Sequence, residues 1–258
     1  MLYRLLAIGD VTGEGGMAHV CRHLRSVRKL KDVNFVVCNG ENASGVGITP
    51  RQAEDLFAAG ADVITLGNHS WGKSQIIDYA EENRYVLRPA NYGPRAPGTG
   101  YRIYEMGRAT IGVMSLIGRC GLEFHADNPF VTADRLLKSS EKPTFTVVDF
   151  HAEATSEKLA LGYYLDGRVS AVWGTHTHVP TADERINPKG TGYITDLGMS
   201  GAIDSVLGLK AECSIDRFLG GVTGRYREAE GPCKMQGALF TLDDTTGLCT
   251  AVERIDIR

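Results

Sequence analysis

Short apolar runs recur along the chain, and they predict the strands of a sheet. The runs cover residues 2–8, 33–38, 62–66, 110–116, 144–150 and 169–173. They are rich in β-branched residues and do not alternate strictly between apolar and polar positions, which is typical of strands buried on both faces. We therefore expect these strands to lie between covering layers.

Segments with a helical pattern separate several of these runs. The clearest is Pro50–Ala59, for which Thr49 is the expected N-cap. Pro50 occupies the first helical position, Gln52 completes a capping box and Gly60 ends the helix. The alternation of strands and helices predicts an α/β layered fold.

The C-terminal part of the chain has a different pattern. The apolar stretches Ala238–Leu242 and Cys249–Ile257 flank the turn sequence Asp243–Gly247, which predicts a β-hairpin. The sheet is therefore expected to gain antiparallel strands there. Because no repeat, low-complexity segment or linker interrupts the sequence, we expect residues 1–258 to form a single domain.

The composition narrows the class of protein. Of the 258 residues, 43% are hydrophobic and 23% are charged, and the net charge is −3. This balance lacks the basic surplus of a nucleic-acid-binding protein, so we expect no stable nucleic-acid complex. No apolar run approaches the ~20 residues of a membrane span, so we expect no membrane association. Six scattered cysteines without a CxxC pair favour reduced thiols in a cytoplasmic protein.

Polar side chains follow the predicted strands where the strands end. This set of carboxylates, carboxamides and imidazoles consists of Asp10, Asn39, Glu41, Asn42, Asn68, His69, His151, His176 and His178. In open α/β folds, ligands bind outside the carboxyl ends of the strands. A lone histidine or asparagine after a strand is usually an ordinary loop residue, but four of the seven histidines of the chain belong to this set. We therefore expect one site at this edge of the sheet.

These residue types suit a pair of divalent metal ions. A carboxylate can bridge two ions through its two oxygens, and neutral imidazole and carboxamide ligands leave a net positive field that polarises a phosphate. His176 and His178 are two residues apart, so in an extended conformation both rings point to the same side. They can then serve two adjacent ions, or one ion with the second close by.

A dinucleotide-binding site is the first competing interpretation. The segment Gly13–Ala18 matches the pattern G-x-G-x-x-A after the first predicted strand. However, Asp10 and Glu14 would bring negative charge to the pyrophosphate. Glu41 also lies farther from the first glycine than the acidic residue that binds the ribose in such sites. The sequence therefore favours the metal site.

Five segments carry a family resemblance: GDVTG (9–13), NGENASGVG (39–47), LGNHSW (66–71), DFHAEATSEK (149–158) and GTHTHVPTAD (174–183). Together they resemble the calcineurin-like metallophosphoesterases, and specifically their YmdB-type branch, over nearly the whole chain. This resemblance implies a layered α/β/β/α sandwich with mixed sheets and a site at the C-terminal ends of the strands.

Two features depart from the general superfamily pattern. The segment Asp10-Val11-Thr12 lacks the histidine of the usual Asp-x-His motif, and Glu41 stands where an aspartate usually bridges the metals. The YmdB-type branch shares both changes, so Asn42 is expected to take over the missing contact. The resemblance then implies one ion held by Asp10, Glu41, Asn42 and His178, and a second held by Glu41, Asn68, His151 and His176. Glu41 is the bridging ligand in this assignment.

The resemblance also implies an activity. It indicates a phosphodiesterase whose substrate is a small phosphate ester, with 2′,3′-cyclic nucleotides as the substrate class. A hydroxide that bridges the two metals would attack phosphorus, and His69 would protonate the leaving oxygen. The resemblance favours iron or manganese, and the set of ligands, which has no thiolate, also accommodates zinc. It further implies a homo-oligomer.

Two other functions remain open at this point. One is a regulatory protein that senses a nucleotide or a metal with only minor turnover. The other is a phosphomonoesterase or nucleotidase that uses the same site with a different substrate pocket. A site that only binds its ligand needs no general acid, so the presence of His69 favours an enzyme.

Overall fold

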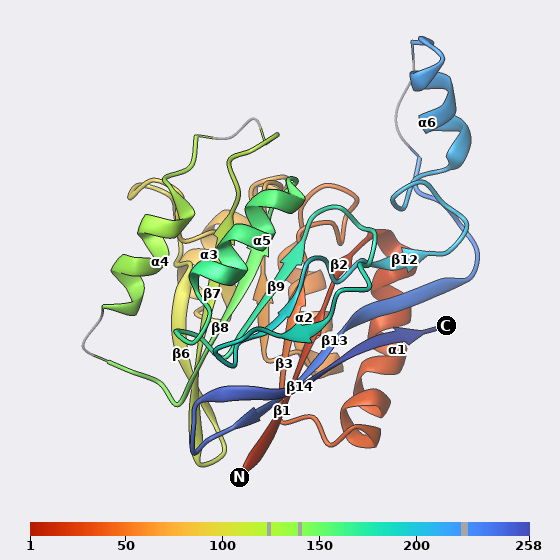
Figure 1. The fold of residues 1–258 in the computed structure, drawn as a ribbon. Coiled ribbons are helices and arrows are strands. Elements are labelled where there is room, and N and C mark those ends of the chain that lie inside the picture. The colour runs from red at the N-terminus through yellow and green to blue at the C-terminus, as the bar shows by residue number, and fades with distance from the viewer. Residues whose placement is uncertain (123–124, 139–140, 223–226) are drawn as a thin grey trace.

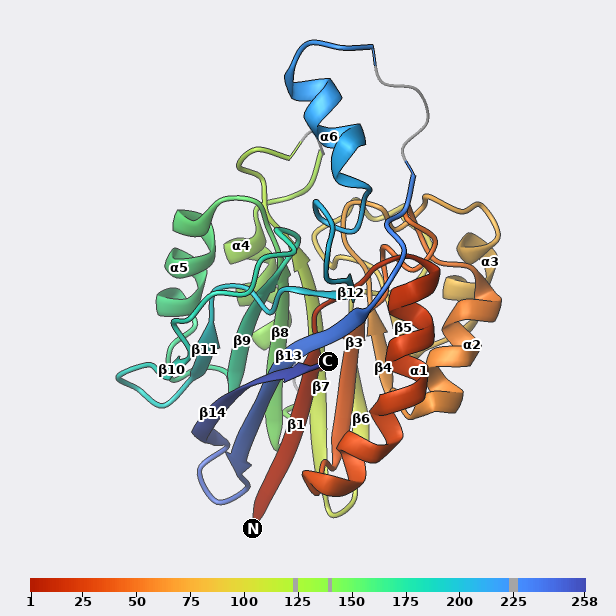
Figure 2. The same ribbon diagram turned by 90° about the vertical axis from the view of Figure 1, so that its right-hand side faces the viewer.

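The computed structural model of the protein describes residues 1–122, 125–138, 141–222 and 227–258. The strands in this part of the chain form two mixed sheets that lie between layers of helices (Figures 1 and 2). The arrangement is the α/β/β/α sandwich expected from the sequence.

The first sheet has the strand order β2-β12-β13-β1-β3-β4-β5, and β14 pairs with β13. Its strands are β1 (Leu2–Ile8), β2 (Asp10–Val11), β3 (Phe35–Asn39), β4 (Val63–Thr65), β5 (Val86–Leu87), β12 (Met199–Ala202), β13 (Cys233–Asp243) and β14 (Leu248–Ile257). Strands β1, β3, β4 and β5 are parallel, whereas β13 is antiparallel to both β1 and β14. The carboxyl ends of the parallel strands therefore share one edge.

The second sheet has the order β10-β11-β9-β8-β7-β6. Its strands are β6 (Tyr101–Met106), β7 (Ala109–Ile117), β8 (Phe145–His151), β9 (Ala171–Thr175), β10 (Arg185–Ile186) and β11 (Gly192–Ile194). The central strands β7, β8, β9 and β11 are parallel, and the two outer strands β6 and β10 are antiparallel to their neighbours.

Six helices accompany the two sheets in the described part of the chain. They are α1 (Gly13–Leu30), α2 (Pro50–Ala59), α3 (Ile76–Glu82), α4 (Pro129–Leu137), α5 (Thr155–Tyr164) and α6 (Ala211–Phe218). Figure 2 shows α1 and α2 on one side of the strands and α4 and α5 on the other, while α6 projects away from the body. Among the described helices, none combines the length and the apolar character needed to cross a membrane.

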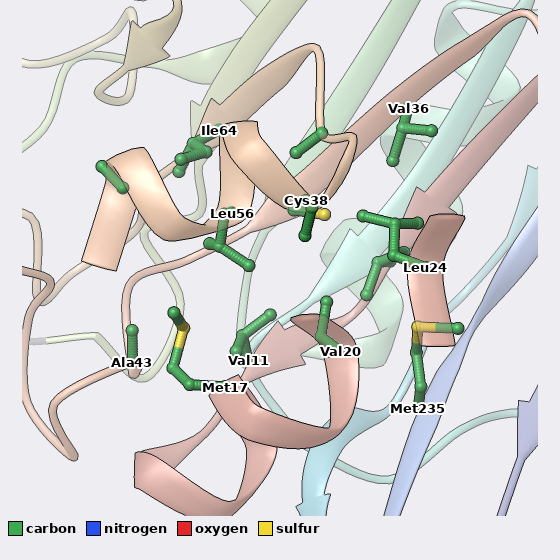
Figure 3. Close-up of a cluster of buried hydrophobic side chains, with 14 of the residues drawn as sticks. Val11, Met17, Val20, Leu24, Val36, Cys38, Ala43, Leu56, Ile64 and Met235 are labelled. Atoms are coloured by element: carbon green, nitrogen blue, oxygen red, sulfur yellow. The ribbon is translucent and has the colours of Figure 1, made fainter. Parts of the chain in front are cut away.

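Three apolar clusters fill the spaces between these layers. In the first, side chains of α1 and α2 such as Leu24 and Leu56 pack on Cys38 and Ile64 of the first sheet (Figure 3). The second cluster lies between the two sheets and the third lies under α4 and α5. Because both faces of the central strands are covered, these strands have continuous apolar runs rather than an alternating pattern.

Local signals predicted several elements closely. Strand β1 has the predicted bounds, and so does α2, in which Thr49 and Gln52 form the expected capping box and Gly60 adopts a left-handed conformation with φ of 117°. The C-terminal hairpin is also confirmed, although β13 begins at Cys233, earlier than predicted.

Candidate metal centre

The eight predicted site residues lie at the ends of strands from both sheets. By strand they are Asp10 at the start of β2, one residue beyond the end of β1, Glu41 and Asn42 after β3, Asn68 and His69 after β4, His151 at the end of β8, and His176 and His178 after β9. The parallel strands of each sheet end at the same side of the molecule, so these loops meet. The candidate site therefore belongs to the junction of the two sheets.

Four of these residues converge on one point. His151 Nε2 lies 3.1 Å from Glu41 Oε1, 2.8 Å from Asn68 Oδ1 and 3.1 Å from His176 Nδ1. The ligand atoms of Glu41, His151 and His176 all lie within 4.8 Å of one another. This geometry brings together the four residues that the resemblance places around the second ion.

The other three proposed ligands, Asp10, Asn42 and His178, adjoin these four residues. Asn42 Nδ2 is 3.3 Å from Glu41 Oε1 and 3.0 Å from His178 Nε2. Asp10 is completely buried, and its Oδ2 accepts a hydrogen bond from the backbone N–H of His176 at 3.0 Å. Asn42 and His178 thus extend the cluster from Glu41, and Asp10 adjoins it beside His151 and His176.

Each of the three histidines that the resemblance assigns as metal ligands has a partner on its outward-facing nitrogen. These contacts are His151 Nδ1 to Thr175 Oγ1 (3.0 Å), His176 Nε2 to Glu153 Oε2 (3.0 Å) and His178 Nδ1 to the Leu207 carbonyl (3.1 Å). Histidines that ligate metals donate their second ring N–H to partners of this kind, which fixes the tautomer. The inward nitrogens are then free to act as ligands.

The charges at the site also fit a cation. Burial raises the pKa of the Asp10 carboxyl to about 6, and Asp10 Oδ1 is buried without a hydrogen-bond partner. A buried acceptor without a partner is costly, and a bound cation would satisfy it. Burial would also raise the pKa of Glu41, but the neighbouring His151 outweighs it and holds the pKa at about 2. These carboxylates, carboxamides and imidazoles fit a hard or borderline divalent metal.

The loop that carries His176 and His178 differs from the sequence-based expectation. An extended His-x-His segment was expected, but β9 ends at Thr175, and His176 and His178 have φ values of 99° and 63°. Positive φ is uncommon for residues other than glycine and persists only where the surroundings impose it. The expected extended geometry is therefore wrong, and the two rings reach different partners from a turn.

This turn is held by a buried ion pair. The sequence did not predict the pair. Lys158 Nζ lies 2.6 Å from Asp196 Oδ2, and both side chains are at most 2% exposed. Asp196 Oδ2 also accepts hydrogen bonds from the backbone N–H and the hydroxyl of Thr177 at 3.2 and 2.7 Å. Thr177 stands between the two histidines, so the pair anchors the strained segment. Nothing in the local sequence distinguishes Lys158 from a solvent-exposed helical lysine.

We expect Asp196→Asn to destabilise the protein by about 3–5 kcal/mol, because it leaves the buried ammonium of Lys158 without a counter-charge. Urea unfolding followed by circular dichroism measures the change. Glu230→Gln is the matched control, because it breaks the pair with Lys210 at the surface, where Glu230 is 85% exposed, and it should have no measurable effect. Equal stability of the two variants would contradict this role of Asp196.

His69 lies at the edge of the cluster. Its backbone N–H donates to Glu41 Oε2 at 3.0 Å, and its Nδ1 lies 2.8 Å from Asn42 Oδ1. The side chain lines a cavity of about 750 Å³ together with Lys73, Glu153 and His176. His69 thus combines contact with the cluster and access to a space of ligand size.

Comparison with known proteins agrees with this fold and cluster. The chain matches the model of the YmdB-like protein family over residues 6–255. It is 44% identical over 254 residues to the 2′,3′-cyclic-nucleotide 2′-phosphodiesterase of Bacillus subtilis (strain 168), covering 98% of this chain and 96% of that protein.

Two solved structures are similar over the whole fold. A hypothetical protein from Thermus thermophilus has a TM-score of 0.92 and 40% identity, with 98% of both chains covered. A phosphatase from Mycoplasma pneumoniae has a TM-score of 0.93 and 33% identity, covering 100% of this chain and 94% of that chain.

The sandwich and the histidine–carboxylate cluster at its strand ends define a protein of the metallophosphoesterase type. The match over residues 6–255 then places it more narrowly: the chain belongs to the YmdB-like protein family. The resemblance drawn from the five sequence segments is confirmed.

Proposed function

We propose that the protein is a dinuclear-metal phosphodiesterase that hydrolyses small phosphate esters, with 2′,3′-cyclic nucleotides as its substrate class. The observation that carries this proposal is the convergence of Glu41, Asn68 and His176 on Nε2 of His151. The substrate class is supported by the 44% identity to a protein named for that activity.

The proposed ligands fall into two sets that share Glu41. One ion is assigned to Asp10, Glu41, Asn42 and His178, and the other to Glu41, Asn68, His151 and His176. When bound, such ions supply Lewis acidity, which lowers the pKa of a water molecule and stabilises charge on the phosphoryl oxygens. The absence of thiolates from both sets suits iron or manganese, and also zinc.

His176 and His178 are proposed to serve different ions. Nδ1 of His176 lies 3.1 Å from His151 Nε2, whereas Nε2 of His178 lies 3.0 Å from Asn42. The inward nitrogens therefore face different halves of the cluster. Glu153 and the Leu207 carbonyl contact the opposite ring nitrogens and orient the two rings separately.

His69 is proposed as the general acid. Nδ1 of His69 lies 2.8 Å from Oδ1 of Asn42, so the amide oxygen can accept the Nδ1 hydrogen. In the doubly protonated ring, Nε2 carries the second proton. That proton can be transferred to the leaving oxygen of a substrate in the cavity that His69 lines, which leaves the ring neutral.

The test of this function combines metal analysis and a substrate screen on anaerobically purified protein. We expect about two divalent ions per chain and faster hydrolysis of 2′,3′-cyclic nucleotides than of phosphomonoesters. Preference for nucleoside monophosphates would support the nucleotidase alternative instead. Metal binding with no hydrolysis of any ester would overturn the enzyme in favour of a metal or nucleotide sensor.

Metal affinity should depend steeply on pH. Burial alone would lower the pKa of His151, but the carboxylates of Glu41 and Asp10 raise it to about 9, so the ring carries a proton at neutral pH in the metal-free protein. A ligating imidazole must lose that proton. The apparent affinity for Mn²⁺ should therefore rise about tenfold per pH unit between about pH 7 and 9 and then level off. Calorimetric titration in two buffers measures both the affinity and the proton released, and an affinity independent of pH would contradict this.

We further propose a cytoplasmic location, a single domain and a homo-oligomer. The six cysteines are all free, which is typical of a reducing compartment. Residues of both sheets complete one cluster, which supports a single domain. The homo-oligomer rests on the family resemblance, and light scattering of the purified protein tests it.

A further inference from the structure

A buried carboxylate beneath the cluster has no role in the proposed mechanism. Asp149 lies on β8, two residues before His151, and is 1% exposed. It accepts three hydrogen bonds: from the hydroxyl of Thr65, from the hydroxyl of Thr175 at 2.8 Å and from the amide nitrogen of Asn39 at 3.3 Å. The three donors lie on three different strands, β3, β4 and β9, whereas Asp149 itself lies on β8.

Each of these donors stands close to a proposed ligand in the sequence. Asn39 ends β3, and its Oδ1 accepts the backbone N–H of Glu41 at 3.2 Å. Thr65 ends β4, three residues before Asn68. Asp149 thus connects, through one side chain, the two strands of the first sheet that precede Glu41 and Asn68.

The third donor connects Asp149 to the second sheet. Thr175 ends β9 directly before His176, and its oxygen lies 3.0 Å from Nδ1 of His151. A carboxylate only accepts, so the hydroxyl hydrogen of Thr175 points to Asp149 and its lone pairs face His151. The Nδ1 atom of His151 must then donate, which leaves Nε2 as the ligand atom.

We infer that Asp149 is the positioning residue for the ion assigned to Glu41, Asn68, His151 and His176. It fixes the relative position of four strand ends and, through Thr175, the tautomer of His151. This inference rests on the proposed function, because it concerns one of the two proposed ions. Partners of this kind typically change metal affinity by about 10–100-fold.

The test compares Mn²⁺ affinities, measured by competition with a chelator, in the whole protein. In Asp149→Asn and Thr175→Val we expect the dissociation constant of one of the two ions to rise about 10–100-fold, and that of the other to change much less because only Glu41 is common to both. Thr175→Ser keeps the hydroxyl and should retain both wild-type constants. If Thr175 contributed only to stability, the folded Thr175→Ser and Thr175→Val variants would have the same Mn²⁺ dissociation constants.

Asp166→Asn is the matched control. Asp166 is also buried and accepts backbone hydrogen bonds from Lys189 and Thr191, away from the cluster. Its replacement should lower the unfolding temperature and leave both Mn²⁺ constants unchanged. It therefore separates the general cost of removing a buried carboxylate from an effect on the metal centre.

The outcomes distinguish this inference from the proposed function. Wild-type protein that binds two ions, with unchanged constants in Asp149→Asn and Thr175→Val, would overturn the inference alone. Wild-type protein that binds no Mn²⁺, Fe²⁺ or Zn²⁺ would overturn both. If Asp149→Asn fails to fold, Thr175→Val and Thr65→Val decide the question, since each removes only one donor.

Discussion

Glu41→Ala is expected to release metal from both positions and to reduce phosphodiesterase activity by at least about a thousandfold. Glu41 is completely buried and is common to the two proposed sets of ligands, with Oε1 3.1 Å from His151 Nε2 and 3.3 Å from Asn42 Nδ2. Removing a shared ligand weakens both coordination spheres at once, and alanine offers no replacement oxygen. Elemental analysis of the folded variant, together with hydrolysis of a 2′,3′-cyclic nucleotide, measures both effects.

Glu153→Gln is the control for this experiment. Its side chain lines the same cavity, but it contacts His176 from the outward side, and glutamine retains an oxygen that can accept the same hydrogen bond. We expect this variant to keep both ions. Retention of two ions by Glu41→Ala would remove the bridging assignment, whatever its activity.

His69→Ala is expected to keep both ions and to lose about 10²–10⁴-fold in turnover on esters with poor leaving groups. The loss should be much smaller for p-nitrophenyl esters, because p-nitrophenolate leaves without being protonated. The loss of kcat should therefore differ between the two substrates. Measuring kcat on both, with the metal content confirmed in the same sample, tests this. Equal losses on the two substrates would remove the general-acid role.

His23→Ala provides the control for a general effect of losing a histidine. His23 is half-buried on α1, where its ring packs at a tilt against His19 with 4.4 Å between centroids, away from the cluster. Its loss should leave both substrates unaffected. The metal-loaded His69→Ala variant also addresses the sensing alternative, because restoration of the cellular role by this variant would favour binding over turnover.

The sequence predicted elements well where the signal is local. The bounds of α2 follow from Thr49, Gln52 and Gly60, all within or next to the helix. Short strands such as β5 and β10 have two residues each, and they exist only because a longer partner strand lies beside them. No periodicity within the segment itself could have indicated them.

The same distinction applies to the candidate site. The candidate residues could be found because they follow predicted strands, and strand ends can be located from the apolar runs. Their assignment as ligands of two ions came from the family resemblance. Asp149, Lys158 and Asp196 could not be identified in this way, since their roles depend on contacts between segments far apart in the chain. The turn at His176 and His178 was also mispredicted for this reason, because its positive φ values depend on hydrogen bonds to Asp10 and Asp196.

The position of the cluster at the junction of the two sheets has a consequence for the life of the protein in the cell. Glu41 and Asn68 follow strands of the first sheet, whereas His151 and His176 belong to the second. An ion held by all four would act as a cross-link between distant parts of the chain, and binding restricted to the native state stabilises that state in proportion to metal supply. A shortage of metal would then lower the amount of folded protein as well as the activity of each molecule. The supply of metal would in this way set how much of the protein is open to degradation.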